Sequence, residues 1–124
     1  MVPKFRAFLV EAKTMHNVLA IDFSRNMYCL QIGKATIGEW FWFREIELIQ
    51  FTGLKDKNGV EIFEGDIVVI KYSEHGYHYY EKIVFENGTF TAGDEDWLYN
   101  IKDYCVVCGN IYENPELLEP ANEI

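Results

Sequence analysis

Two short segments carry the residue types of a zinc site. The segment 105–108 reads Cys-Val-Val-Cys, and the segment 75–78 reads His-Gly-Tyr-His. Thiolate and imidazole are ligands that Zn²⁺ prefers. A zinc knuckle needs a turn between its cysteines, whereas two valines favour an extended strand, in which a separation of three sends Cys105 and Cys108 to opposite faces. We therefore expect no metal ligands here and two buried free thiols instead.

The histidines lie in a run of aromatic and polar residues. General acid–base chemistry would require His75 or His78 to pair with Glu74 or Glu81 inside a pocket, and no sequence feature indicates one. The run is interpreted either as an exposed loop whose tyrosines partly cover the core, or as a contact surface, because Tyr is enriched in recognition loops. The candidate contact residues of this hairpin are Tyr72, His75, Tyr77, His78, Tyr79 and Tyr80.

Residues 40–43 read Trp-Phe-Trp-Phe. Alternate residues of a strand point to opposite faces, so one pair is expected in the core and the other at an interface. Trp40 and Trp42 are candidate contact residues. Unpaired strand edges invite pairing with another chain, and we therefore predict a homo-oligomer.

Other catalytic patterns are absent from the sequence. It contains no Gly-rich phosphate loop, no Ser/His/Asp set in a local motif and no diagnostic carboxylate pair. We therefore predict a protein that is not an enzyme, with no catalytic residue, no cofactor-binding residue and no cofactor.

Composition narrows the class of partner. The 124 residues carry a net charge of −9, and phosphate backbones are bound by Lys and Arg, so direct nucleic-acid binding is not expected. Six basic residues up to position 50 are scattered along the sequence: Lys4, Arg6, Lys13, Arg25, Lys34 and Arg44. The acidity favours solubility, or else a surface that imitates DNA.

The location of the protein is predicted from its apolar segments and cysteines. No N-terminal leader is recognised, and no apolar run approaches the roughly 20 residues that span a bilayer. The three cysteines, Cys29, Cys105 and Cys108, fit reduced thiols. We expect a cytoplasmic protein without membrane attachment.

The elements that must position these residues are mainly strands. Aromatics make up 16% of the chain, which favours β structure. Alternating or β-branched segments predict strands at 5–9, 18–23, 27–32, 79–85, 89–92 and 104–112, and a bulge or helical turn is expected at 44–47. Short helical turns are expected at 97–99 and 116–119.

Closely spaced turns organise the middle of the chain. Asn58-Gly59, a dipeptide that readily takes positive φ, predicts a tight hairpin turn that pairs 52–54 with 61–63. Gly65-Asp66 predicts a second turn into the strand 67–70, and Asn87-Gly88 predicts another hairpin.

These elements predict a mainly β fold of antiparallel strands with little helix. The five-strand rhythm of the C-terminal half is typical of a small SH3-like barrel, and the N-terminal half is β-rich. We expect one domain over 1–119, with a β-rich part at 1–54 and a barrel-like part at 55–119. Residues 120–124 are expected to form a mobile tail.

Three segments resemble one family in its own order. They are Lys4-Phe5-Arg6-Ala7-Phe8, the long stretch 50–68 (QFTGLKDKNGVEIFEGDIV) and the stretch 109–118 (GNIYENPELL). This pattern is similar to that of the YopX-like proteins of phages and prophages, although that family often has Trp where this chain has Phe8. The resemblance implies a phage or prophage origin and a mostly β fold with a barrel-like part. It implies no activity, because the family is uncharacterised, so no site residue is carried over.

Three functional hypotheses follow. The first is a non-enzymatic binding or interaction module that acts in the host cytosol on an unknown host or phage protein. The second is an acidic DNA mimic or inhibitor of a host nucleic-acid enzyme. The third is a small enzyme that uses the His75/His78 hairpin.

Overall fold

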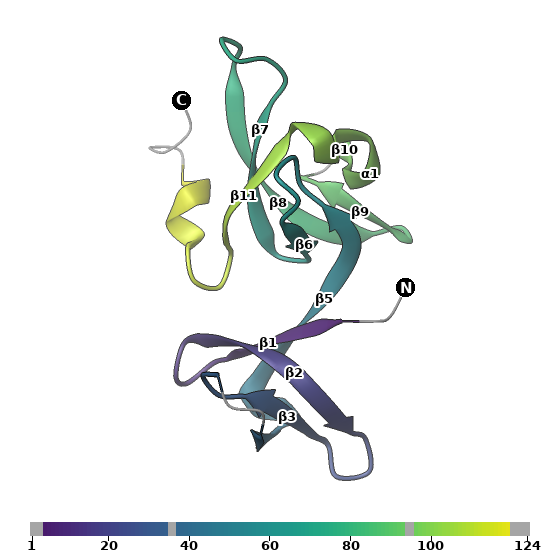
Figure 1. Cartoon of the computed structure of the whole chain (residues 1–124), viewed down its shortest axis with the longest axis vertical. Coiled ribbons are helices and arrows are strands. Elements are labelled where there is room, and N and C mark those ends of the chain that lie inside the picture. Colours follow the sequence, from purple (N-terminus) through teal and green to yellow (C-terminus); the bar gives the residue numbers. More distant parts are fainter. Residues whose placement is uncertain (1–3, 35–36, 94–95, 120–124) are drawn as a thin grey trace. The chain divides into compact units, whose positions relative to one another are not determined.

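The computed structural model describes residues 4–34, 37–93 and 96–119. These residues form a mainly β chain with two antiparallel sheets of six and five strands (Figure 1). In chain order the elements are β1 (Phe5–Leu9), β2 (Thr14–Asp22), β3 (Met27–Gln31), β4 (Gly38–Trp42), η1 (Phe43–Glu45), β5 (Ile46–Lys55), β6 (Glu61–Phe63), β7 (Asp66–Lys71), β8 (His78–Glu86), β9 (Thr89–Ala92), β10 (Asp96–Trp97), α1 (Leu98–Ile101), η2 (Lys102–Tyr104), β11 (Cys105–Asn110) and η3 (Pro115–Leu118).

The chain divides into two compact units, Met1–Gln50 and Phe51–Ile124. Strand β5 runs from the first into the second: its residues up to Gln50 pair with β1, and Phe51 and Lys55 pair with β6. The expected single domain over 1–119, with parts at 1–54 and 55–119, stays a prediction. The expected mobile tail lies outside the described residues.

The first unit is an antiparallel arrangement of β1 to β4 with the start of β5. Its strand order is β4-β3-β2-β1-β5, so most neighbours in space are neighbours in sequence. The apolar residues alternate, and one face of these strands forms a core of Ala7, Tyr28, Leu30 and Ile46. The strands expected at 18–23 and 27–32 pair as the hairpin of β2 and β3, with Asn26 at φ 56° in its turn.

A short helical turn separates β4 from β5, as predicted, but it begins at Phe43. The Glu45 carboxylate stabilises it by accepting a hydrogen bond of 2.7 Å from the Trp42 backbone N–H. The alternation of the aromatic run continues into the first residue of this turn. Phe41 and Phe43 both pack against the core, while Trp40 and Trp42 remain about two-fifths exposed. Phe41 and Phe43 are thus the core pair, and an interface role of Trp40 and Trp42 stays a prediction.

The second unit surrounds β7. This strand lies between β8 and β11, and β8 continues through β9 to β10 (Figure 1). Ile67, Val68 and Ile70 of β7 are completely buried. The core cluster of this unit draws its buried residues from several elements: Ile62, Val68, Ile70, Ile83, Ala92, Leu98, Ile101 and Cys105.

The turns of the middle segment lie at the predicted sites. Asn87 and Gly88 both have positive φ, as a two-residue hairpin turn requires, but at Asn58-Gly59 only Gly59 does, with φ 81°. The Gly59 N–H donates to Asp56 O, and the Asp56 N–H donates to Val60 O. The loop of this hairpin is thus one residue longer than a two-residue Asn-Gly turn. A turn from Asp56 to Gly59 is followed by Gly59 itself, whose positive φ returns the chain to pair with β5.

The second sheet is open in the described part of the chain. Strands β10 and β11 stand at its two ends and are not paired with each other. Over these residues we find no closed barrel, since β10 has only two residues, Asp96–Trp97, and pairs with β9 alone. None of the helices in the described ranges has the length and apolar character needed to cross a membrane.

Candidate contact surfaces

The two cysteines of the Cys-Val-Val-Cys segment have different surroundings. Cys105 is fully buried on β11 and its Sγ–H donates to Ile101 O, whereas Cys108 is exposed and its Sγ–H donates to Ile67 O. The register of β11 with β7 shifts between Val107 and Gly109, so Cys108 falls at a bulge. The expectation of two buried thiols is therefore wrong for Cys108.

No metal-binding group is assembled from these residues. Within residues 4–34, 37–93 and 96–119, no set of three or more His, Cys, Asp and Glu side chains gathers around one point. Burial, together with the Asp56 and Asp96 carboxylates, raises the pKa of Cys105 to about 12. Partial burial of its sulfur also raises the pKa of Cys108. Both thiols are thus held in the protonated form, which is a poor metal ligand and a poor nucleophile.

The histidines of the β7–β8 hairpin have no catalytic partner in the described chain. His75 is exposed and His78 half-buried, and neither ring makes a hydrogen bond or ion pair with Glu74 or Glu81 there. A general base needs a partner or substrate proton within hydrogen-bond reach. This geometry gives the acid–base hypothesis no support.

The tyrosines beside them do form a connected cluster. The Tyr72 and Tyr104 rings lie 5.0 Å apart, and the Tyr77 and Tyr79 rings stack at 6.0 Å. Burial, together with the neighbouring Tyr72 side chain, raises the pKa of Tyr79 to about 12. We call Tyr72, Tyr77, Tyr79 and Tyr104 the tyrosine surface.

The tyrosine surface keeps Tyr72, Tyr77 and Tyr79 of the predicted hairpin set, leaves out His75, His78 and Tyr80, and adds Tyr104. Tyr80 pairs with Val69, whereas Tyr79 pairs with Ile70, so the two adjacent side chains point to opposite faces of β8. Tyr104 is a new member that the sequence analysis missed. It belongs to η2, far from the hairpin in sequence, and only the pairing of β11 with β7 brings it close.

Trp40 and Trp42 also acquire partners that the sequence analysis missed. The Arg25 guanidinium lies 4.9 Å from the Trp40 ring centre, and that of Arg44 lies 5.1 Å from the Trp42 ring centre. Cations over aromatic faces are attracted by the ring quadrupole. We call these four residues the tryptophan–arginine surface. A local signal existed only for Arg44, which follows Trp42 by two positions.

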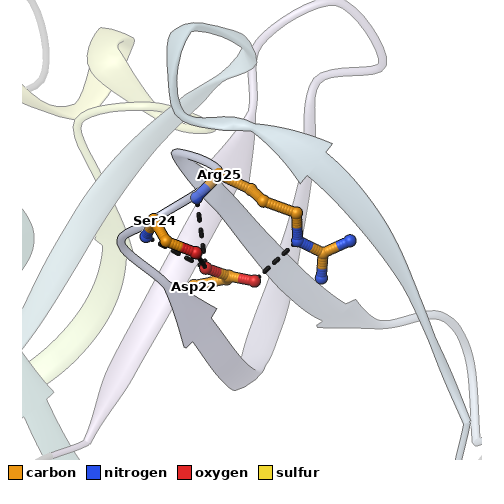
Figure 2. Close-up of polar contacts among 3 residues, drawn as sticks. All are labelled: Asp22, Ser24 and Arg25. Carbon is orange, nitrogen blue, oxygen red and sulfur yellow. Dashed lines mark hydrogen bonds and ion pairs between the residues drawn. The ribbon is translucent and has the colours of Figure 1, made fainter.

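Arg25 is held by a dense set of hydrogen bonds in the β2–β3 turn. The Asp22 carboxylate accepts from the Ser24 N–H, the Ser24 hydroxyl and the Arg25 N–H, and Arg25 Nε donates to it at 2.6 Å (Figure 2). The hydrogen bonds from Ser24 and Arg25 lower the pKa of Asp22 to about 2. Figure 2 shows the two terminal nitrogens of Arg25 pointing away from Asp22. The turn therefore fixes the guanidinium and leaves its outer donors for another group.

A cavity of about 430 Å³ opens beside this arrangement. It is lined by Arg25, Asn26, Trp42, Phe43 and Arg44. Two arginines and a tryptophan thus line one concavity, although the chain as a whole is strongly acidic. Such a site favours a small anionic group beside an apolar one.

The two aspartates of the stretch 50–68, the longest family-like segment, stabilise the fold. The Asp56 carboxylate is buried and accepts hydrogen bonds from the N–H groups of Asn58, Val60 and Val107, so it joins the β5–β6 hairpin to β11. Asp66 is also buried and accepts from the Phe63 N–H. These carboxylates are occupied by backbone donors and are not poised for chemistry.

The C-terminal motif is structural in the same way. A Cβ at Gly109 would lie only 2.6 Å from the Asn114 amide oxygen, which accepts a hydrogen bond from the Asn110 N–H. The Asn110 side-chain oxygen accepts from the N–H groups of Tyr112 and Glu113. The glycine and the two asparagines build one turn that leads into η3.

The chain was compared with curated sequences, solved structures and protein families. No protein in a search of curated sequences matches the chain. The crystal structure of protein EF1440 from Enterococcus faecalis is similar to it, with 34% sequence identity, a TM-score of 0.69, and coverage of 96% of this chain and 99% of that one. The family model described as YopX protein matches residues 4–119, so the chain belongs to the YopX family.

Proposed function

We propose that this protein is a non-enzymatic interaction module that binds another protein through the tyrosine surface. The observation that carries the proposal is the pre-organised ring cluster. Tyr72, Tyr77 and Tyr104 are 51%, 73% and 42% exposed, yet each is in ring contact with another member of the cluster. Tyrosines held in this way offer a large contact area with little side-chain entropy left to lose.

The arrangement of the second unit supports the expected SH3-like character of this part. Its first long strand, β7, pairs with both the second strand and the last one, and a helical turn precedes the last. Small SH3-like barrels share this order. We propose a barrel-like sheet that presents the tyrosine surface at the β7–β8 end.

The family membership supports the setting in which the module acts. We propose a phage or prophage accessory protein that works in the cytosol of the host, with a host or phage protein as its partner. The three cysteines are free, which agrees with a reducing compartment.

Capture from host lysate tests the proposal. Wild-type protein is compared with the double variant Tyr72→Ala/Tyr77→Ala. Tyr99→Ala serves as the matched control, since Tyr99 is 70% exposed and its ring lies 5.7 Å from Lys102 Nζ, outside the tyrosine surface. We expect a partner that the wild type and the control retain at about 1 M salt, where charge contacts are screened, and that the double variant loses.

Two outcomes would contradict the proposal. Equal capture by all three proteins removes the role of the tyrosine surface. A nucleic-acid-binding enzyme that is released at high salt and is unaffected by the tyrosine changes supports the acidic DNA mimic instead.

A further inference from the structure

We propose that the tryptophan–arginine surface is a second binding site, one that takes an extended acidic segment of another protein. A carboxylate of that segment lies in the cavity between Arg25 and Arg44, and its backbone runs along β4. Its residues belong to the first unit, whereas those of the tyrosine surface belong to the second. The proposed site does not depend on the function proposed above.

The positive charges of Arg25 and Arg44 favour a carboxylate at this surface. The Arg25 side chain contacts Asp22 through Nε alone, and Arg44 makes no hydrogen bond or ion pair within the described residues. Both arginines line the same cavity. A carboxylate placed there would accept charge-assisted hydrogen bonds from two pre-positioned donors, which are stronger than neutral ones.

Exposed apolar side chains of β2 and β4 favour a partner that also has apolar groups. Leu19, Trp40 and Trp42 are 46%, 41% and 42% exposed on the strands β2 and β4. A Cβ at Gly38 would lie 2.6 Å from Cys29 Sγ and 3.0 Å from Leu19 Cδ1, so Leu19 and Cys29 share this side of the sheet with Gly38. Trp40 and Trp42 follow Gly38 at strand spacing and extend the same apolar face.

The outer edge of β4 favours a partner in an extended conformation. β4 ends the six-stranded order, and no strand of the described chain pairs with its outer edge. The Phe43 N–H donates to Asn26 O, next to β3, whereas the Trp42 N–H donates to the Glu45 side chain. Backbone groups alternate in direction along a strand, so those of Trp40 point outward like those of Trp42. The Trp42 N–H is already bound to Glu45, so an extended segment can pair as an added strand with the outward backbone groups of Trp40.

The chemistry favours an acidic protein segment over the other anionic partners. A nucleic acid would carry many phosphates toward a chain of net charge −9, and it has no backbone that completes a β-sheet. A second copy pairing through the same edge would place its own arginines beside Arg25 and Arg44, where like charges repel.

The test uses synthetic peptides and intrinsic fluorescence. The Trp97→Phe protein retains only Trp40 and Trp42 as tryptophans. It is titrated with the acetylated and amidated hexapeptide Thr-Val-Glu-Val-Thr-Val, with the same peptide carrying Gln for Glu, and with a form N-methylated at alternate amides. We expect saturable fluorescence change with the Glu peptide, and about tenfold weaker binding for each of the other two.

Variants separate geometry from charge. Arg25→Lys and Arg44→Lys keep the net charge but lose the planar fork, and each is expected to weaken binding of the Glu peptide about fivefold or more. Asp22→Asn removes a negative charge, which by simple attraction would strengthen binding. Because Asp22 positions Arg25, we expect it to weaken binding about threefold, while Asp103→Asn, with the same charge change on η2, leaves it unchanged.

Several results would overturn the proposal. Equal binding of the Glu and Gln peptides excludes a carboxylate site, and unchanged binding in both Lys variants excludes Arg25 and Arg44. Tighter binding by a short oligothymidylate than by the Glu peptide assigns the surface to nucleic acid. A concentration-dependent fluorescence change without any peptide assigns it to a second copy of the chain. Thermal melts confirm that each variant is folded.

Discussion

At the scale of single residues, Gly65 shows why the family motif needs glycine at the turn into β7. Its φ is 85°, and a Cβ would lie 3.0 Å from the Tyr112 ring. Its N–H donates to Ile83 O and its carbonyl accepts from the Ile111 N–H, so the backbone has no freedom to move away. Conformation and space both exclude a side chain here.

We expect Gly65→Val to lower the free energy of unfolding by about 1–3 kcal/mol. The matched control is Gly59→Val, because Gly59 has φ 81° but no atom within 4 Å of the added Cβ. It carries the conformational cost without the steric one, and its loss should be smaller. Chemical denaturation of the two variants measures the difference. Equal stability of Gly65→Val and wild type would refute the turn assignment.

Asp56 is a buried carboxylate that satisfies three backbone N–H groups. Asp56→Ala leaves those donors without their acceptor, and we expect a loss of about 3 kcal/mol or more. Asp103→Ala is the control, since the Asp103 side chain is 77% exposed and should change stability by less than about half a kcal/mol. Similar melts for both variants would contradict the structural role given to Asp56.

Cys105 provides a pH dependence with a definite sign. Its pKa is raised on folding from 9.0 to about 12, mainly by burial. A group with a raised pKa contributes stability below its unfolded pKa, and this contribution is lost as the pH rises toward the folded value. We expect the melting temperature to fall between about pH 9 and pH 11, and to fall less in Cys105→Ala. Parallel curves for the two proteins would contradict this assignment.

At the scale of elements, β7 organises the second unit because it pairs on both edges and is buried on most of its length. Ile67 is fully buried and pairs with Lys82 of β8 and Gly109 of β11. We expect Ile67→Ala to cost about 2–5 kcal/mol and to lower the melting temperature by several degrees.

The control for β7 comes from the same strand. Lys71 is exposed at its end, so Lys71→Ala should stay within about half a kcal/mol of wild type. If the two variants melt together, β7 is not the core strand that its burial indicates.

At the scale of the whole molecule, strand edges predict self-association. Within the described residues the sheets end at β4, β6, β10 and β11. Unpaired edges template pairing with another chain, and the arginines disfavour β4 for this role. We expect a homo-oligomer at micromolar concentration, formed through the other edges. Light scattering that gives only the 14.5 kDa monomer mass would refute the prediction.

The sequence by itself determined the features that depend on neighbouring residues. Asn87-Gly88 adopts positive φ at both positions, Gly65 turns the chain into β7, and a helical turn separates β4 from β5. Each follows from the conformational range of glycine or asparagine, or from a break in alternation, within a few residues. The pairing of β2 with β3 follows for the same reason, because a short turn leaves few alternative registers.

Only the tertiary structure decided which distant side chains meet. Tyr104 reaches Tyr72 because β11 pairs with β7, and the bulge after Val107 exposes Cys108 while Cys105 stays buried. Arg25 and Arg44 appear scattered in the sequence, yet β3–β4 pairing brings both to one cavity. Register between distant strands depends on how the whole core packs, and no local pattern encodes it.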